Sequence, residues 1–271
     1  MNILHAIILA IVEGLTEFLP ISSTAHMIFT SSILGIGQDK FVEMFQVSIQ
    51  FGAILAVVAL YWKKFFDFKN SSFYFKLIAA VIPALVLGKL FDDKIEAVLG
   101  NPIPIAIVLI IGGIVLLFID NAFNQATISD EKEIPMRTAI TIGFWQCLAM
   151  MPGTSRSAAS IIGGMQQKLS RKAAAEFSFF LAVPTMFAVT VYSIFLKDWN
   201  QQGMDVKGYE LLQQGNNLSL FFIGNIVAFL VAILAIKSFI SLLTKYGFKL
   251  WGWYRIVVGF ILIIYFIYFQ K

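Results

Sequence analysis

Residues 13–26 read EGLTEFLPISSTAH, and this polar stretch in a very apolar chain decides how the chain can fold. It places two carboxylates, a proline, several hydroxyl side chains and a histidine between apolar flanks. An ionisable group at membrane depth costs roughly 2.5–3.5 kcal/mol on insertion scales, so such groups usually mark function. A second polar stretch, residues 152–160 (PGTSRSAAS), interrupts the other half of the chain. We name these stretches the first and the second break, and we expect them to meet in one site.

The composition is that of a membrane protein. The chain has 271 residues, of which 59% are hydrophobic and 13% charged, with a mean hydropathy of +0.82. A soluble domain carries about 25% charged residues, so we predict a polytopic membrane protein. The net charge of +4 is spread over loops, which fits contact with anionic lipid headgroups. No basic aromatic platform is evident in the sequence, so nucleic acid is not expected as a partner.

Six apolar segments approach the ~20 residues needed to cross a bilayer. Each break lies between two shorter apolar pieces, and none of these pieces can span alone. In the first break, Pro20 interrupts the helix, and Ser22 or Ser23 offers an N-cap for the next one. Two short helices around a polar turn predict a re-entrant hairpin, which needs protein around its exposed backbone. The predicted fold class is therefore an all-α integral membrane protein with six transmembrane helices and two re-entrant helical hairpins. The expected spans are residues 41–62, 75–91, 103–119, 173–196, 218–236 and 254–269.

The order of these elements repeats along the chain. Each half reads as a short helix, a break, a short helix and three spans. The separation of Pro20 from Pro152 is nearly the same as that of Glu43 from Glu176. We therefore predict a single membrane domain built from two repeats. The first repeat comprises residues 1–119, the connector residues 120–137, and the second repeat residues 138–271.

The distribution of charge predicts an orientation for the spans. Under the positive-inside rule, the basic turn 63–69 lies on the cytoplasmic side, and three spans per half then place the other basic clusters there as well. The first hairpin then enters from outside and the second from inside. Such an inverted-topology repeat tends to hold its site near the bilayer midplane. The other clusters expected inside are residues 120–137, 168–172 and 237–255, whereas loops 92–101 and 197–217 fall outside.

The first break carries groups for acid–base, metal and nucleophilic chemistry. Glu13 and Glu17 lie four residues apart and share one helical face. Two adjacent carboxylates in a low dielectric need a proton or a divalent metal between them, unless they face solvent at a helix end. Ser22 and Ser23 can cap the second short helix, or provide a hydroxyl that an imidazole activates. His26 lies within reach of both serines, and it can also attack phosphorus itself or act as an acid or base.

The second break has the features of a phosphate site. Arg156 stands in a loop rich in glycine and serine before a helix, where free backbone N–H groups and a guanidinium favour an anion. The alternative is a surface arginine, but its place in the break that mirrors the first one favours the phosphate site. A phosphate that faces carboxylates needs a metal or a proton to avoid repulsion, so hydrolysis explains the two breaks better than transport does. The lipid surroundings predict a substrate with an apolar tail and an anionic head.

Both breaks closely resemble the two signatures of the bacterial undecaprenyl-pyrophosphate phosphatases of the bacitracin-resistance type. The matching stretches are EGLTEFLPISSTAHM and PGTSRSAAS, and the resemblance covers essentially the whole chain. It implies hydrolysis of undecaprenyl pyrophosphate to undecaprenyl phosphate and inorganic phosphate, which recycles the lipid carrier for peptidoglycan and other cell-wall polymers and confers bacitracin resistance. It also implies a bacterial cytoplasmic membrane, a site that opens to the outer face, and a protein that often forms homodimers. Ala158 and Ser160 depart from the glycine and threonine that are usual in the second signature.

The resemblance also implies roles for particular residues. The implied catalytic residues are Glu17, His26, Ser23 and Arg156, and Ser23 is a better candidate than Ser22 for direct chemistry. Glu13 and Glu17 are the pair implied to hold a divalent cation, Mg²⁺ or Ca²⁺. The attacking group stays open between Ser23, His26 and a metal-bound water. Substrate phosphate is expected at Arg156, Ser155, Ser157, Gly153, Ser22, Thr24 and Ser160.

Two other classes of function compete with hydrolysis. The first is a transporter or flippase for an anionic polyprenyl lipid, because inverted repeats and broken helices are typical of transporters. The second is a structural membrane protein, against which the buried charged groups count. Phosphate release by the purified protein in detergent, where no gradient exists, separates hydrolysis from transport.

Overall fold

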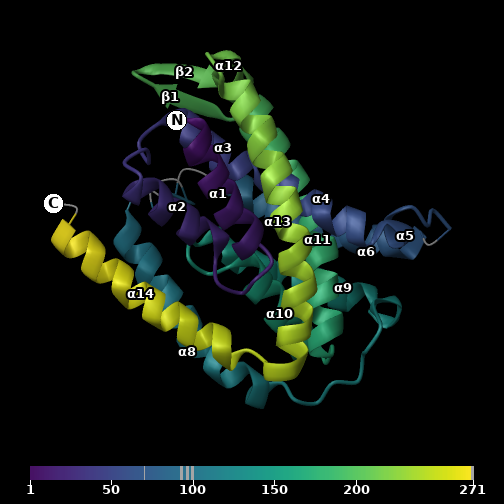
Figure 1. Ribbon diagram of the computed structural model, residues 1–271. Coiled ribbons are helices and arrows are strands. Elements are labelled where there is room, and N and C mark those ends of the chain that lie inside the picture. Colours follow the sequence, from purple (N-terminus) through teal and green to yellow (C-terminus); the bar gives the residue numbers. More distant parts are fainter. Residues whose placement is uncertain (70, 92–93, 96–97, 99–100, 270–271) are drawn as a thin grey trace.

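The computed structural model describes residues 1–69, 71–91, 94–95, 98 and 101–269, and helices dominate it (Figure 1). The predicted outer loop 92–101 lies largely outside the described residues. The helices of the first half are α1 (Ile3–Thr16), α2 (Ser23–Ile33), α3 (Lys40–Ser48), α4 (Gln50–Leu60), α5 (Trp62–Phe65), α6 (Ser71–Leu90) and α8 (Pro102–Ala122). The connector contains the 3₁₀ turn η1 (Glu131–Glu133). The second half contains α9 (Met136–Gln146), η2 (Cys147–Met150), α10 (Arg156–Gln166), α11 (Arg171–Val191), the π-helical turn η3 (Tyr192–Leu196), β1 (Asp198–Gln201), β2 (Met204–Lys207), α12 (Gly208–Gln213), α13 (Asn217–Tyr246) and α14 (Lys249–Phe269).

Six helical segments in the described part of the chain are long and apolar enough to cross a membrane, which confirms the predicted number of spans. α3 and α4 adjoin at Ile49, which keeps right-handed helical dihedral angles, and together they form the first span. Large apolar side chains cover the outer faces: Phe118 of α8 is 64% exposed and Leu234 of α13 is 67% exposed. Lipid accommodates such side chains, so the chain is a multi-pass membrane protein. The segments are Lys40–Leu60, Ser71–Leu90, Pro102–Ala122, Arg171–Leu196, Asn217–Tyr246 and Lys249–Tyr268.

Each break turns the chain between two short helices through a serine in a left-handed conformation. Ser22 has a φ of 69°, and its side chain accepts a hydrogen bond from the Ala25 N–H to cap α2. Ser155 has a φ of 77° and caps α10 in the same way, by accepting from the Ala158 N–H. Positive φ is uncommon outside glycine and persists where the surrounding structure enforces it. The N-cap is therefore Ser22, which leaves the hydroxyl of Ser23 for another partner.

The first short helix of each half packs on a span of the other half. α1 packs on α13, and α9 packs on α6. Two glycines allow these close approaches: a Cβ on Gly14 of α1 would collide with the Ala228 carbonyl of α13, and a Cβ on Gly143 of α9 would collide with the Ala80 carbonyl of α6. Small residues have this role at helix contacts in membranes. α8 and α14 pack on each other along the lower left of Figure 1.

Arg255 of α14 is buried and joins the two breaks. It is 1% exposed, and its guanidinium donates to backbone carbonyls of Leu109, Pro20, Thr154 and Gly153 at 3.1, 3.2, 2.9 and 2.7 Å. Arg255, the last residue of the predicted basic cluster 237–255, is therefore buried between the two breaks. Its helix carries it inward because the breaks leave carbonyls without helical partners, and a guanidinium has enough donors to satisfy several of them.

The remaining basic segments predicted to share one side of the membrane lie together in the fold. Lys64, just beyond α4, pairs with Glu131 of the connector at 2.5 Å. Arg171 at the start of α11 pairs with Asp120 near the end of α8 at 2.7 Å, and Asp120 also accepts from the Phe248 N–H between α13 and α14.

At the other end of α13, β1 and β2 pair antiparallel beside α12 (Figure 1). The second predicted outer loop is thus a folded hairpin.

Candidate active site

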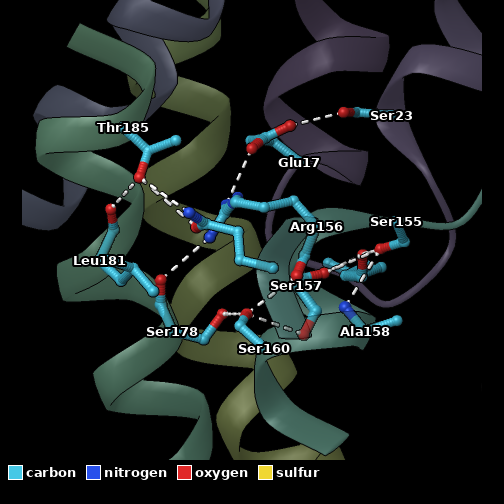
Figure 2. A network of polar contacts seen from close by, with 12 residues as sticks. Glu17, Ser23, Ser155, Arg156, Ser157, Ala158, Ser160, Ser178, Leu181 and Thr185 are labelled. Carbon is cyan, nitrogen blue, oxygen red and sulfur yellow. Dashed lines mark hydrogen bonds and ion pairs between the residues drawn. The ribbon is translucent and has the colours of Figure 1, made fainter. Parts of the chain in front are cut away.

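Glu17 lies at the centre of a contact between the two breaks. It follows the last residue of α1 and is 6% exposed. Its Oε2 accepts a hydrogen bond from Ser23 Oγ at 2.5 Å, and its Oε1 accepts one from Arg156 Nη2 at 2.8 Å. Figure 2 shows the three side chains in a row, with Glu17 between the other two. The structure therefore brings three of the four predicted catalytic residues together.

Arg156 is buried at the start of α10, so it is not a surface arginine. Its Nη1 donates to the backbone carbonyl of Ser178 on α11 at 2.9 Å (Figure 2). Its Nε is buried and has no hydrogen-bond partner among the described residues. A buried donor without a partner destabilises the protein. An anionic ligand that accepts a hydrogen bond from Nε removes this cost, and its binding is therefore favoured.

The serines of the second break hold this arginine in place. Ser157 Oγ donates to the Leu19 carbonyl of the first break at 2.8 Å, and Ser155 Oγ lies 3.1 Å from Ser157 Oγ. Ser160 Oγ bonds to the Arg156 carbonyl and to Ser178 Oγ, at 2.8 and 2.6 Å. Ser157 and Ser160 are thus engaged in joining the breaks and α11, away from the cavity described next.

A cavity of about 490 Å³ opens beside the Glu17–Arg156 pair. Its wall is polar near this pair and becomes apolar along α6 and α11, where Leu85, Met186 and Val189 line it. A site with a few convergent polar groups and an apolar wall suits a ligand with an anionic head and a hydrocarbon tail. Of the predicted site residues, those on the cavity wall are Glu17, Ser22, Ser23, Thr24, Gly153, Ser155 and Arg156.

Several polar residues of the wall, among them Gln146, Thr185 and Lys89, had no role in the predictions from sequence. Gln146 of α9 is 3% exposed, and its Nε2 donates to Thr185 Oγ1 of α11 at 3.2 Å. Lys89 near the end of α6 also lines the cavity. None of the three belongs to either break or to a motif of its own. The one available signal was the amide of Gln146 within the apolar sequence 142–151, because burying an amide without a partner is costly.

His26 does not line the cavity beside the Glu17–Arg156 pair. Its Nδ1 lies 2.8 Å from the Ser22 carbonyl oxygen, and its Nε2 lies 2.9 Å from the Tyr254 hydroxyl oxygen on α14. The imidazole therefore contacts the backbone of Ser22 rather than its hydroxyl. The structure does not bring the fourth predicted catalytic residue into the cluster of the other three.

Glu13 is a fully buried carboxylate one helical turn before Glu17. It is 0% exposed, and neither of its oxygens has a hydrogen-bond partner among the described residues. Such a group requires a proton or a cation. The described residues contain no cluster of three or more His, Cys, Asp or Glu side chains. Mg²⁺ is commonly bound by one or two carboxylates together with water and substrate phosphates, so the donor set of Glu13 and Glu17 fits this ion.

The arrangement suits phosphoryl transfer. A hydroxyl that donates to a buried carboxylate can lose its proton to that carboxylate as it attacks. A guanidinium fixed by two acceptors is preorganised to hold phosphate oxygens and the charge that develops on them. Ser23, Glu17 and Arg156 combine these features at one cavity wall.

Comparisons with known proteins identify similar chains over nearly the full length. The family described as "Bacitracin resistance protein BacA" matches residues 6–261. A protein of Flavobacterium psychrophilum named undecaprenyl-diphosphatase is 53% identical over 264 residues, which cover 97% of this chain and 96% of the relative. Proteins of the same name from Flavobacterium johnsoniae and Bdellovibrio bacteriovorus are 51% and 44% identical, with the same shares of both chains covered.

Proposed function

Because the chain belongs to the bacitracin resistance protein BacA family, we propose that it is an undecaprenyl-diphosphatase. It removes the terminal phosphate of undecaprenyl pyrophosphate and yields undecaprenyl phosphate, the lipid carrier of cell-wall synthesis. The observation that supports this reaction best is the contact of Glu17 with both Ser23 and Arg156. It puts a hydroxyl, a base and a phosphate-binding cation at one cavity wall.

Binding of the substrate begins with its pyrophosphate at Arg156. The unpartnered Nε of Arg156 donates a hydrogen bond to a phosphate oxygen. Gly153 and Ser155, which lie on the same wall, contact the other phosphate oxygens. The first carbons of the lipid tail follow the apolar wall between α6 and α11. A phosphate dianion competes with Glu17 for the guanidinium, so binding releases the carboxylate for proton transfer.

In the proposed chemical step, Ser23 Oγ attacks the terminal phosphorus while Glu17 accepts the hydroxyl proton. A bond forms between Oγ and phosphorus, and the bond from phosphorus to the bridging oxygen breaks, so that undecaprenyl phosphate leaves. Glu17 passes the proton it has taken to the departing undecaprenyl phosphate and is again a carboxylate. Water then attacks the phosphoserine while Glu17 accepts a proton from this water. The bond from phosphorus to Ser23 Oγ breaks, the proton returns from Glu17 to Oγ, and inorganic phosphate leaves. Arg156 stabilises the equatorial oxygens in both steps. The geometry favours Ser23 over His26 as the nucleophile, because only Ser23 contacts Glu17 and lines the cavity.

A divalent cation, Mg²⁺ or Ca²⁺, is part of the proposal. Glu13 and Glu17 would hold it, and when bound it would neutralise the charge of the pyrophosphate. The two unpartnered oxygens of Glu13 support this assignment.

The setting of the enzyme is proposed to be the bacterial cytoplasmic membrane, with the cavity open to the outer face.

The two halves are proposed to form an inverted-topology repeat, in which the pairing of α1 with α13 corresponds to that of α9 with α6. The matching caps at Ser22 and Ser155 support the same relationship. A homodimer is proposed from the resemblance, and multi-angle light scattering in detergent tests it.

Purified protein in detergent micelles tests the reaction. Undecaprenyl pyrophosphate and Mg²⁺ are added, and inorganic phosphate is measured. We expect release by the parent protein, loss of release in Glu17→Gln and Arg156→Ala, and normal release in the connector variant Lys132→Ala. The broken helices would also suit a flippase. A flippase moves lipid between two sides of a membrane, which micelles do not have, and it releases no phosphate. A folded parent protein that releases none would therefore contradict the proposed hydrolysis.

A further inference from the structure

Two hydrogen bonds hold the His26 ring, and Tyr254 of α14 makes one of them. Nε2 lies 2.9 Å from the Tyr254 hydroxyl oxygen, while Nδ1 lies 2.8 Å from the Ser22 carbonyl oxygen. The two rings are also nearly parallel, with their centroids 5.7 Å apart and an angle of 11° between their planes. Neither residue lines the cavity at the Glu17–Arg156 pair.

The partner at Nδ1 decides which nitrogen of the neutral imidazole carries the proton. A backbone carbonyl can only accept a hydrogen bond, so Nδ1 must be the donor. Nε2 then holds a lone pair, and the Tyr254 O–H donates to it. If the imidazole gains a second proton, the same phenol oxygen can accept from Nε2–H. Tyrosine therefore suits both protonation states of His26.

The residue that His26 holds is the strained one in the first break. Ser22 has a φ of 69°, and Ser23 follows it directly. The direction of Ser23 Oγ toward Glu17 depends on the backbone at Ser22. A rigid imidazole bonded to the Ser22 carbonyl therefore restrains the peptide that presents Ser23.

We propose that Tyr254 is a positioning residue for the first break. It orients His26 so that Nδ1–H holds the Ser22 carbonyl, and this contact keeps Ser23 against Glu17. The proposal deepens the proposed phosphatase function and rests on it. His26 then acts through the backbone of Ser22, and not by contact with the reacting phosphorus.

The first test reads the imidazole directly and does not depend on turnover. The chain has two histidines, so His5→Gln leaves His26 as a single signal. Long-range ¹H–¹⁵N NMR of this variant, labelled with ¹⁵N-histidine in detergent, reports the tautomer. We expect the proton on Nδ1, and we expect Tyr254→Phe to move the Nε2 resonance toward that of a lone pair without a donor. A proton on Nε2 with Tyr254 intact, or an unmoved Nε2 resonance in Tyr254→Phe, would overturn the proposal.

The second test measures turnover of undecaprenyl pyrophosphate. Tyr254→Phe keeps the ring and loses one hydrogen bond, so kcat should fall about tenfold while KM stays within about twofold. Tyr268→Phe is the matched control, because Tyr268 lies on the same helix and is 73% exposed; it should leave both constants unchanged. An unchanged kcat in Tyr254→Phe contradicts the positioning role. Absence of turnover in the parent contradicts the proposed phosphatase instead, and the NMR result distinguishes the two failures.

Discussion

Arg156 Nη2 lies 2.8 Å from Glu17 Oε1, although 139 positions separate the two residues in sequence. Both side chains are almost fully buried, with exposed fractions of 9% and 6%. A buried ion pair adds little net stability, but loss of one partner leaves an uncompensated charge and is strongly destabilising. This contact keeps the two breaks assembled, and the same guanidinium is the group we propose for phosphate binding.

Arg156→Lys tests whether the fork of the guanidinium is needed rather than its charge. An ammonium cannot bond to Glu17 and to the Ser178 carbonyl in the same planar geometry. We expect kcat/KM to fall by about 10²-fold or more, as for the loss of a preorganised donor. The measurement is phosphate release in detergent, with Arg137→Lys at an exposed position in the first turn of α9 as control. Near-normal turnover of Arg156→Lys would show that a point charge is sufficient.

Ser23→Ala and Ser22→Ala separate chemistry from capping. Ser23 bonds to Glu17, so its loss should lower kcat by about 10³-fold or more if it is the nucleophile. Ser22 caps α2, so its loss should cost about 1 kcal/mol of stability and lower kcat less. Mass spectrometry of rapidly quenched parent protein should detect phosphate on the peptide that carries Ser23. If Ser23→Ala keeps most of its turnover, the nucleophile is a water or His26.

Glu13→Gln tests the proposed cation site without relying on activity. A ligand that binds only the folded protein raises its unfolding temperature. Mg²⁺ should therefore stabilise the parent protein, and this increment should be lost in Glu13→Gln. Without Mg²⁺ the variant should be at least as stable as the parent, because a neutral amide costs less to bury than an unpaired carboxylate. Glu133→Gln, in the exposed connector, is the control and should keep the increment. An equal Mg²⁺ increment in both variants would argue against the site.

Gly112→Ala tests the role of Arg255 in holding the breaks. A Cβ at Gly112 would overlap the Arg255 guanidinium, which would lose carbonyl partners in both breaks as it moves. We expect a loss of about 1–3 kcal/mol in unfolding free energy, as for other overpacked sites. Thermal unfolding in detergent measures it. Gly88→Ala on α6 is the matched change, since its Cβ would meet only the Met150 side chain at 3.8 Å, and it should be neutral or stabilising. Equal stability of the two variants would show that Arg255 can move freely.

Much of the architecture was predictable because hydropathy is a local property. Each span is a continuous apolar run, and Pro20 with its neighbouring serines ends a helix regardless of what surrounds it. The choice between Ser22 and Ser23 as the N-cap was not predictable. It depends on a positive φ at Ser22, which the closed structure enforces.

The surroundings of individual polar residues in the helices could be learned only from the tertiary structure. Arg255 reads as one more positive charge in a basic segment, and only its contacts with carbonyls of both breaks reveal that it is buried. Gln146 and Thr185 become part of the site because α9 and α11 meet at the cavity. The amide of Gln146 in an apolar stretch hints at a buried partner, but it does not indicate which helix supplies that partner.

By itself, the sequence determined that this chain is a membrane protein with two polar breaks, because the cost of placing charged and polar groups in lipid belongs to each residue. It also determined which residue types are available for phosphate chemistry. Only the tertiary structure decided which of them meet: it sets Ser23 and Arg156 against Glu17 and turns His26 toward Tyr254. These contacts depend on angles between helices distant in the chain, and such angles arise from packing, which no local pattern records.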